Sequence, residues 1–271
     1  MSAAPFRDNV VVLTGASAGI GLAIARRLAA QGAALVLAAR EAGKLEQAAE
    51  ECRRLGARAV AVPTDVGDPA QCVALVDSAV AEFGRIDTLV NNAGIGMWAR
   101  FDEVTDLSVF ERIMRINYLG SVHLTHAALP HLKRARGRIV AMGSLTARTG
   151  VPTRSGYAAS KHAMAGFFDS IRIELADDGV TVTQIHPGFV ATEIRERAFG
   201  PDGRPLGAGN SPVREKEVMS ADECARISVD AMTKRTREVI MTPRAKIGMW
   251  LKLISPAAVD RIAKRAIEQG K

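Results

Sequence analysis

Two side chains four residues apart, those of Tyr157 and Lys161, have the chemistry of a proton-transfer pair. They fall at the predicted start of a helix, where residues four apart share a face with Cβ atoms about 5–6 Å apart. A phenol with a pKa of about 10 is a poor base at neutral pH, but a neighbouring ammonium favours the phenolate and lowers that pKa. The pair therefore predicts a general acid–base group. Ser144 follows a predicted strand and falls at the same edge of the predicted sheet.

A surface Tyr–Lys pair beside an unrelated serine is the alternative, and a glycine-rich loop far upstream argues against it. The predicted strand Val10–Leu13 runs into Thr14-Gly15-Ala16-Ser17-Ala18-Gly19-Ile20-Gly21, and a helix follows. Gly15 permits a tight turn, Gly19 lets the backbone approach a pyrophosphate, and Gly21 allows close packing. The N–H groups at the start of the helix then face the phosphates. Although the spacing is G-x3-G-x-G, its place between strand and helix predicts a dinucleotide site.

The end of the second predicted strand bears on which dinucleotide binds. An acidic residue there suits the ribose 2′-OH of NAD, but the sequence has Ala39-Arg40. A guanidinium can form two charge-assisted hydrogen bonds with a 2′-phosphate. Arg40 therefore predicts NADP(H), with Ser17 as a further phosphate donor. The alternative is that Arg40 is a solvated residue at the start of a helix.

Two more segments end strands at the same predicted crevice. Asp65-Val66 is placed to hold the adenine amino group through Asp65, unless this residue only caps a turn or helix. In Asn91-Asn92-Ala93-Gly94, the small residues let the backbone lie against a ribose. Ligands of open α/β sheets bind at this carboxyl edge.

Short apolar runs alternate with longer helical patterns along the chain, as in a parallel sheet covered on both faces. The predicted strands are Val10–Leu13, Leu35–Ala38, Ala59–Val62, Ile86–Val90, Arg138–Met142, Val180–Ile185 and Glu238–Met241. The predicted helices are Ile20–Gln31, Glu41–Leu55, Pro69–Phe83, Leu107–Arg134, Gly156–Asp178 and one from about Ala221. The alternation predicts an α/β, three-layer Rossmann fold with a doubly wound parallel sheet, as a single domain over residues 1–271.

The order of these motifs resembles that of the short-chain dehydrogenase/reductase family over roughly residues 8–192. The matching pieces are TGASAGIG at 14–21, NNAG at 91–94, Asn117, Ser144, YAASK at 157–161 and PGFVAT at 187–192. The resemblance implies hydride transfer between nicotinamide and a carbonyl or alcohol carbon. It also implies homodimers or homotetramers that associate through the two long helices.

The resemblance assigns roles to individual residues. Ser144 would hold the substrate oxygen, Tyr157 would exchange its proton, Lys161 would lower the Tyr157 pKa and bind the nicotinamide ribose, and Asn117 would hold a water at a helix distortion. Thr192 would contact the nicotinamide carboxamide. The expected cofactor-binding set is Gly15, Ser17, Gly19, Ile20, Gly21, Arg40, Asp65, Val66, Asn92, Ala93, Gly94, Tyr157, Lys161, Pro187, Gly188, Val190 and Thr192.

The expected substrate pocket is apolar and favours a lipophilic ketone or alcohol that is sterol-like, fatty-chain or aromatic. Its predicted residues are Gly96, Met97, Trp98, Ser144, Leu145, Phe189 and Ile194, with Ile95 beside them and a lid at about 193–217. A 3-oxoacyl thioester is the competing substrate, since Arg100, Arg195 or Arg197 would suit its acidic carrier. A dinucleotide-sensing protein without turnover is a weaker alternative because Tyr157 and Lys161 are both present. An epimerase or dehydratase is weaker because such chains are usually longer, with a dedicated C-terminal substrate domain that is not expected here.

The composition of the chain is that of a globular protein and excludes several other classes of protein. Hydrophobic residues are 48% and charged residues 24% of 271, as in soluble globular proteins. The three scattered cysteines, Cys52, Cys72 and Cys224, predict neither a disulfide framework nor a zinc site. The N-terminal segment lacks a signal-peptide pattern, and no apolar run is long enough to span a bilayer. A cytoplasmic enzyme that does not bind nucleic acid is expected.

The positive charge of the chain is concentrated at its C-terminal end. Residues 234–271 hold ten Lys and Arg against three Asp and Glu, which accounts for the whole net charge of +7. The extension at about 244–271 also contains Trp250 and several aliphatic residues. A basic amphipathic helix of this kind lies on an anionic membrane surface, folds over the substrate pocket or packs at a subunit interface, and the sequence leaves these three open.

Overall fold

Seven short strands rich in Val, Leu, Ile and Ala pair into one parallel sheet. The computed structural model describes residues 4–207 and 218–268. The strands are β1 (Val10–Thr14), β2 (Ala34–Ala39), β3 (Arg58–Pro63), β4 (Thr88–Asn91), β5 (Arg138–Met142), β6 (Thr181–His186) and β7 (Glu238–Ile240). Their order is β3-β2-β1-β4-β5-β6-β7. The near-continuous apolar pattern of the strands follows from burial on both faces, since all five residues of β1 are buried.

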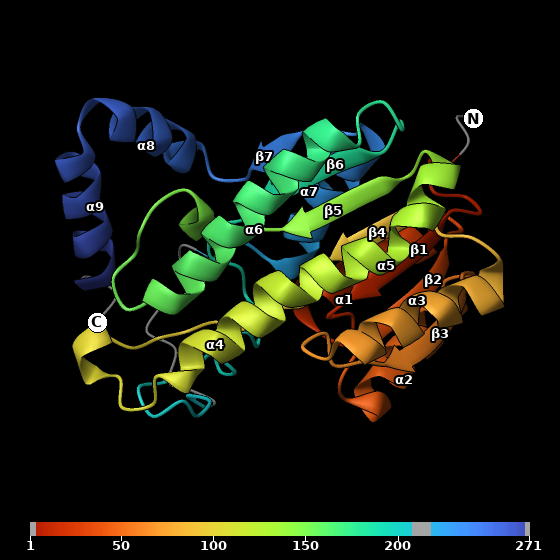
Figure 1. Ribbon diagram of the computed structural model, residues 1–271, viewed down its shortest axis with the longest axis horizontal. Coiled ribbons are helices and arrows are strands. Elements are labelled where there is room, and N and C mark those ends of the chain that lie inside the picture. The colour runs from red at the N-terminus through yellow and green to blue at the C-terminus, as the bar shows by residue number, and fades with distance from the viewer. Residues whose placement is uncertain (1–3, 208–217, 269–271) are drawn as a thin grey trace.

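Helices cover both faces of the sheet, which confirms the predicted three-layer fold (Figure 1). On one face, α1 (Gly19–Ala29), α2 (Ala42–Arg54) and α7 (Ala221–Thr233) contribute to one apolar core. On the other, α3 (Pro69–Phe83), α5 (Gly120–Ala135) and α6 (Ser155–Glu174) contribute to a second core. Right-handed crossovers place successive helices in this way.

The helix predicted over 107–134 is not continuous, which corrects the sequence expectation. It divides into α4 (Ser108–Met114), a π-helical segment η2 (Arg115–Leu119) and α5. The apolar periodicity runs through all three, so the pattern alone did not mark the change of pitch. Just after the π-helical segment, Gly120 packs closely against the segment that follows β3, since a Cβ there would lie 2.7 Å from the Val66 carbonyl oxygen. The extra residue in the π turn turns Asn117 inward, and its side chain is completely buried.

The strand order reverses between β1 and β4, and this reversal opens a crevice at their carboxyl ends. The β1–α1 loop and the β4 end lie on opposite sides of the crevice. The loops after β5 and β6 continue it toward the N-terminal end of α6. The fold therefore gathers the sequence-predicted motifs along one edge of the sheet.

The predicted lid is partly described. Residues 208–217 lie outside the described residues, and residues 193–207 form turns and short bridges. Phe199 donates its backbone N–H to the Gly96 carbonyl at 3.0 Å, and Trp98 donates to the Phe199 carbonyl at 2.8 Å. These two bonds tie the described part of the lid to the segment that follows β4.

The basic C-terminal extension is helical, as predicted. It forms α8 (Pro243–Ile254) and α9 (Pro256–Glu268), which Figure 1 shows beyond the β7 edge of the sheet. In the described part of the chain, none of the helices is long and apolar enough to cross a membrane.

Candidate active site

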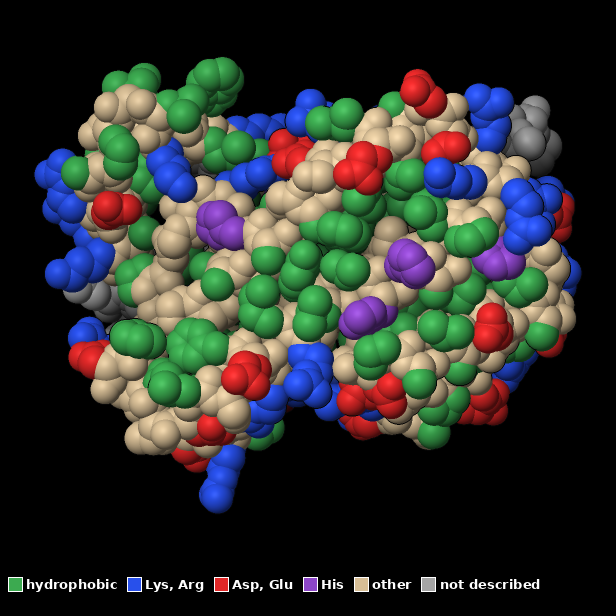
Figure 2. All heavy atoms as spheres, viewed as in Figure 1, with side chains coloured by type: hydrophobic (Ala, Val, Ile, Leu, Met, Phe, Trp, Pro, Cys, Tyr) green, Lys and Arg blue, Asp and Glu red, His purple; other side chains and the backbone are tan. Residues whose placement is uncertain are grey.

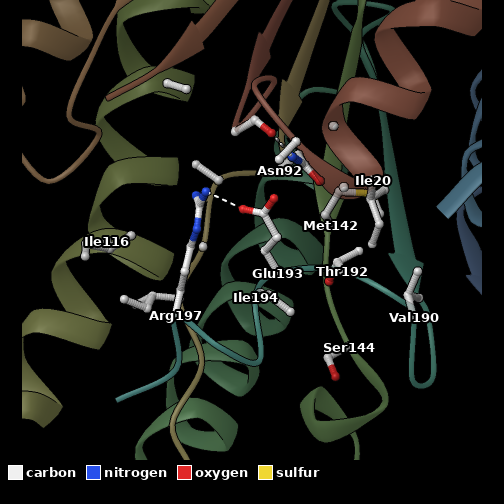
Figure 3. A pocket seen from close by; sticks show the side chains of 18 of the residues that line it. Ile20, Asn92, Ile116, Met142, Ser144, Val190, Thr192, Glu193, Ile194 and Arg197 are labelled. Carbon is white, nitrogen blue, oxygen red and sulfur yellow. Dashed lines mark hydrogen bonds and ion pairs between the residues drawn. The ribbon is translucent and has the colours of Figure 1, made fainter. Parts of the chain in front are cut away.

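A cavity of about 250 Å³ runs along the crevice from the β1–α1 loop to the start of α6. All seventeen residues predicted to bind the cofactor line it. Of the predicted substrate residues, Ser144, Phe189 and Ile194 line it together with Ile95. Figure 3 shows Ile20, Asn92, Ser144, Val190 and Thr192 around one space, although they come from distant parts of the sequence.

Four predicted substrate residues, Gly96, Met97, Trp98 and Leu145, do not line the cavity. Met97 is 1% exposed and packs in the apolar cluster behind Tyr157. A Cβ at Gly96 would lie 3.3 Å from the Ala198 Cβ, so Gly96 faces the lid. Gly96, Met97 and Trp98 were placed by their position after β4, where the structure has Gly96 and Trp98 bonded to the Phe199 backbone. Leu145 follows β5 and begins a short 3-10 helix.

The glycine-rich loop is shaped by contacts that a side chain would obstruct. Gly15 has a φ of +65° and Gly19 a φ of +56°, both in the left-handed region that favours glycine. A Cβ at Gly21 would lie 2.1 Å from the Gly15 carbonyl oxygen. A Cβ at Gly19 would lie 3.0 Å from the Thr192 Cγ2, across the cavity. The loop thus presents bare backbone where a pyrophosphate is expected.

Thr14, which the sequence analysis did not single out, joins this loop to the end of β4. Its hydroxyl accepts from the backbone N–H groups of Asn92 and Ala93, both at 3.0 Å, and donates to the Val90 carbonyl at 3.2 Å. Asn92 Nδ2 donates in return to the carbonyls of Thr14 at 2.8 Å and Gly15 at 3.2 Å. The sequence did offer a signal for this role, because Thr14 stands at the end of a predicted buried strand and directly before the glycine-rich loop.

The far end of the cavity carries the groups predicted to face the adenosine. Arg40 is exposed at the cavity lining and has no hydrogen bond or ion pair with the residues that the structure describes. Asp65 uses Oδ1 to accept from the Gly67 N–H at 2.9 Å, so it caps a turn and also lines the cavity. The bare loop and the unpaired Arg40 fit a dinucleotide that carries an additional phosphate.

The lid reaches this end through a charged bridge. Arg197 contacts Glu193 at 2.5 Å and Glu41, beside Arg40, at 3.2 Å. Figure 3 shows the Arg197–Glu193 contact within the cavity lining. The Arg197 charge is therefore already matched by two carboxylates.

Ser144, Tyr157 and Lys161 meet at the other end of the cavity. Burial raises the pKa of Tyr157, while the Arg154 guanidinium and a hydrogen bond with Ser144 act in the opposite direction. Lys161 donates from Nζ to the Met142 carbonyl at 2.7 Å, and Nζ lies 5.9 Å from the centre of the Tyr157 ring. Burial lowers the pKa of Lys161 to about 8. The Arg154 guanidinium, which the sequence analysis did not consider, lowers the Tyr157 pKa. The predicted effect of Lys161 on the Tyr157 pKa stays a prediction.

Asn117 holds the β4 end rather than lining the cavity. Its Oδ1 accepts from the Ile95 N–H at 2.8 Å, and its Nδ2 donates to the Ile95 carbonyl at 3.0 Å and to the Ser160 hydroxyl at 2.9 Å. A Cβ at Gly94 would lie 3.2 Å from Asn117 Oδ1 and 3.7 Å from Lys161 Nζ. One amide hydrogen therefore fixes the Ile95 backbone, and the other donates to the Ser160 side chain on α6.

A buried histidine supports Ser144 from behind, and the sequence analysis did not identify it. His186 is fully buried; its Nδ1 lies 3.0 Å from the Ser144 carbonyl oxygen and its Nε2 lies 3.2 Å from Glu238. Arg148 also donates to Glu238, at 2.6 Å. The contacts with His186 and Arg148 lower the pKa of Glu238 to about 2, although burial acts in the other direction.

Comparisons with known proteins agree with this geometry. A family model described as short chain dehydrogenase matches residues 9–201. The chain is 37% identical over 259 residues to 11-beta-hydroxysteroid dehydrogenase 1A of Arabidopsis thaliana. This alignment covers 93% of the chain and 73% of the relative. A short chain dehydrogenase/reductase from Burkholderia phymatum in complex with NAD has a TM-score of 0.83 at 27% identity, over 93% of this chain and 95% of that one. A short chain dehydrogenase from Burkholderia cenocepacia J2315 in complex with NADP has a TM-score of 0.75 at 30% identity, over 86% and 95%.

Proposed function

The chain belongs to the short-chain dehydrogenase/reductase family, and on this premise we propose that it is an NADP(H)-dependent enzyme interconverting a lipophilic ketone and a secondary alcohol. One observation carries the proposal. Ser144, Tyr157 and Lys161 stand at one end of a cavity whose other end is a bare glycine loop. An acid–base group and a phosphate cradle in one cavity suit redox chemistry on a carbonyl group.

The mechanism follows from the groups at the Tyr157 end. A bound NADPH would supply the hydride to the carbonyl carbon. The Ser144 hydroxyl donates a hydrogen bond to the carbonyl oxygen and fixes the substrate. Tyr157 transfers its hydroxyl proton to the same oxygen, which becomes the alcohol hydroxyl, and it is left as a phenolate. Oxidation runs the same proton transfer in reverse.

The surrounding charges adjust the acidity of Tyr157. Burial alone would hold the phenol in its protonated form, whereas Arg154 and the Ser144 hydrogen bond stabilise the phenolate. Lys161 adds a cation beneath the ring, although its own pKa of about 8 weakens this contribution above neutral pH. Asn117 acts on this site indirectly, by fixing the Gly94–Ile95 backbone against Lys161.

NADP(H) is the proposed cofactor because Arg40 lines the cavity without a partner among the described residues. A guanidinium in this position can hold a 2′-phosphate in two hydrogen bonds. Cells keep NADP largely reduced, so we propose that the chain works as a carbonyl reductase. The relatives bind either dinucleotide, since the Burkholderia structures hold NAD in one case and NADP in the other.

The apolar part of the cavity supports the proposed substrate class. Ile95, Phe189 and Ile194 line the end near Tyr157. The name of the Arabidopsis relative points to a hydroxysteroid. A panel of lipophilic ketones and 3-oxoacyl thioesters, followed by NADPH absorbance at 340 nm, would identify which class is turned over.

The two tyrosines of the chain offer a matched test of the mechanism. Tyr157→Phe removes the hydroxyl that we assign to proton transfer, so turnover should fall by about 100-fold or more while NADPH binding persists. Tyr118→Phe removes the same atom from a ring that packs against Phe167, 6.1 Å between ring centres, and is the control. Turnover that survives in Tyr157→Phe would refute the assignment.

We also propose that copies of the chain associate through α5 and α6. Figure 2 shows hydrophobic side chains gathered on the face where these helices lie. Leu119 is 39% exposed just before α5, and Ile173 is 69% exposed near the end of α6. The burial of such side chains between subunits would stabilise a homodimer or homotetramer.

A further inference from the structure

Arg154, the residue immediately before α6, places a guanidinium in the cavity lining without a matching acid. Its central carbon lies 3.9 Å from the centre of the Trp98 ring and 5.2 Å from that of Phe189. Its side chain has no hydrogen bond or ion pair with any residue in the described part of the chain, and its Nε is buried. Burial lowers the Arg154 pKa to about 10, so the group stays charged at neutral pH.

The aromatic contacts of Arg154 lie on the faces of its guanidinium plane and leave the N–H donors at the edge of that plane without a partner among the described residues. Aromatic rings attract the cation through their π faces. A guanidinium carries five N–H donors, all in its plane, and ring stacking satisfies none of them. A half-buried cation with unused donors is costly unless something binds it. A planar fork of donors matches the two oxygens of a carboxylate.

The neighbouring charges add to this positive potential. Arg195 lies 5.9 Å from the centre of the Phe189 ring and also lines the cavity. Its guanidinium donates to the Val190 carbonyl at 3.1 Å, and the structure shows no ion pair for it among the described residues. The two glutamates of the cavity lining, Glu41 and Glu193, both contact Arg197 instead. The end of the cavity near Tyr157 therefore favours an anion.

We propose that Arg154 binds a carboxylate of the substrate, so that the enzyme selects oxo acids with an apolar body. This inference rests on the proposed function and narrows its substrate class. Arg154 and Tyr157 line the same cavity, so one small substrate can place a carboxylate on Arg154 and a carbonyl at Tyr157. The apolar lining contacts the remainder of the molecule.

Pairs of ketones that differ only in charge test this selection. The probes are 4-oxopentanoate, 5-oxohexanoate and 7-oxooctanoate, each beside its methyl ester, with kcat/KM measured by NADPH oxidation. The enzyme should prefer at least one acid over its ester by about 10- to 100-fold, the range expected for hydrogen bonds to a charged group. Arg154→Gln should remove this preference and Arg154→Lys should keep part of it. Arg226→Gln, at an arginine on α7 whose side chain is 55% exposed outside the cavity, should leave the acid-to-ester ratio unchanged.

A binding measurement separates this inference from the proposed function. The chain has two tryptophans, so Trp250→Phe leaves Trp98, beneath Arg154, as the only indole. Titration of this variant with the same acids and esters should change Trp98 emission more strongly for the acids. The difference should disappear when Arg154→Gln is added, with folding checked by circular dichroism.

The outcomes are distinguishable. Acids that bind through Arg154 without any turnover would support this inference and overturn the proposed function. Ketones that are turned over with equal kcat/KM for acid and ester, and bind equally well to Arg154→Gln, would overturn this inference alone.

A different observation concerns the hairpin of α8 and α9. Ile247, Trp250, Leu253 and Ile254 are exposed by 69%, 72%, 78% and 84%, and their spacing places them on one side of α8. Figure 2 shows hydrophobic side chains gathered at the α8 end of the molecule. Lys252 ties α8 to the body of the protein by donating to the Arg148 carbonyl at 2.8 Å. Exposed apolar patches of this kind mark interaction sites.

The charge of the hairpin identifies its partner. Residues 243–268 contain six Lys and Arg against two Asp and Glu. Exposed basic residues beside an apolar helical face suit a membrane surface with anionic lipids. We propose that the hairpin binds such a surface peripherally, with the apolar side of α8 entering the interface.

Vesicle sedimentation tests this contact with the full chain. Vesicles of phosphatidylcholine with phosphatidylserine should carry the protein into the pellet, and those of phosphatidylcholine alone should bind it at least about 10-fold less. Leu253→Ser with Ile254→Ser should lose binding, whereas Val73→Ser, at a side chain 49% exposed on α3, should not. If the double variant changes the oligomer mass but not vesicle binding, α8 is a subunit contact and the proposal is overturned.

Discussion

Gly21 sits where the glycine-rich loop turns into α1, and its replacement by alanine isolates the role of close backbone packing. Gly21 has no positive φ, so alanine is tolerated by the backbone and only the added methyl group matters. The new Cβ would lie 2.1 Å from the Gly15 carbonyl oxygen and 2.6 Å from Asn92 Nδ2. Real Cβ contacts are essentially never below 3.0 Å, so the Gly15 peptide must move by about 1 Å.

The cost follows from the contacts that this movement breaks. Asn92 loses its bond to the Gly15 carbonyl, at 3.2 Å, and its bond to Thr14, at 2.8 Å, is distorted. Overpacking of a tight site costs about 1–3 kcal/mol, which is about 5- to 150-fold in an equilibrium. We expect Gly21→Ala to unfold several degrees lower and to bind NADPH about 10- to 100-fold more weakly.

Thermal unfolding with and without NADPH measures both effects, because a ligand that binds only the folded state raises the melting temperature according to its affinity. The matched control is Gly43→Ala in α2, where a Cβ would meet no atom within 4 Å. This variant should unfold at or slightly above the wild-type temperature, since alanine favours helix over glycine by about 1 kcal/mol. A Gly21→Ala protein that keeps both the wild-type melting temperature and its NADPH-dependent shift would refute the steric argument.

Two further perturbations test Arg40 in the cavity lining and Glu238, which contacts His186 behind Ser144. Arg40→Asp should lower the ratio of kcat/KM for NADPH to kcat/KM for NADH by about 10-fold or more. The reason is that the carboxylate repels a 2′-phosphate and accepts a hydrogen bond from a 2′-OH. An unchanged ratio would make Arg40 irrelevant to cofactor choice. Glu238→Gln should lower the free energy of unfolding at neutral pH by about 2–3 kcal/mol, because the folded-state pKa of about 2 lies below the ordinary 4.5. That contribution is present above pH 4.5 and is lost as the pH falls toward 2. The free energies of unfolding of the wild type and Glu238→Gln, measured with urea, should therefore converge as the pH falls through this range. A difference between the two proteins that is constant with pH would contradict the ion-pair explanation.

The sequence was sufficient wherever function depends on local geometry. Gly15 and Gly19 adopt positive φ values in the loop that their spacing predicted. Tyr157 and Lys161 share a helix face because they are one turn apart. The strands were recognisable because burial on both faces leaves a continuous apolar run, and the positions of their carboxyl ends follow from parallel pairing.

Other features depend on contacts between residues far apart in the sequence, and the tertiary structure decided them. The periodicity over 107–134 is helical throughout, and only the family resemblance implied a distortion at Asn117. The structure shows that it is a π turn and that Asn117 bonds Ile95 and Ser160 there. Gly96 and Met97 come five and six residues after β4, but they lie outside the cavity lining, where the lid residue Phe199 bonds the backbone on either side of Met97.

Arg154 is the clearest case of a residue whose role the sequence did not reveal and the tertiary structure decided. In the sequence it is one of 36 lysines and arginines, and nothing nearby distinguishes it from a solvated cation. The fold brings Trp98 and Phe189 against it from segments 56 and 35 residues away. Short-range sequence patterns specify backbone conformation and helix faces, because these depend on neighbours along the chain. Which charge is buried beside Tyr157 depends on packing across the sheet, and only the assembled fold determines it.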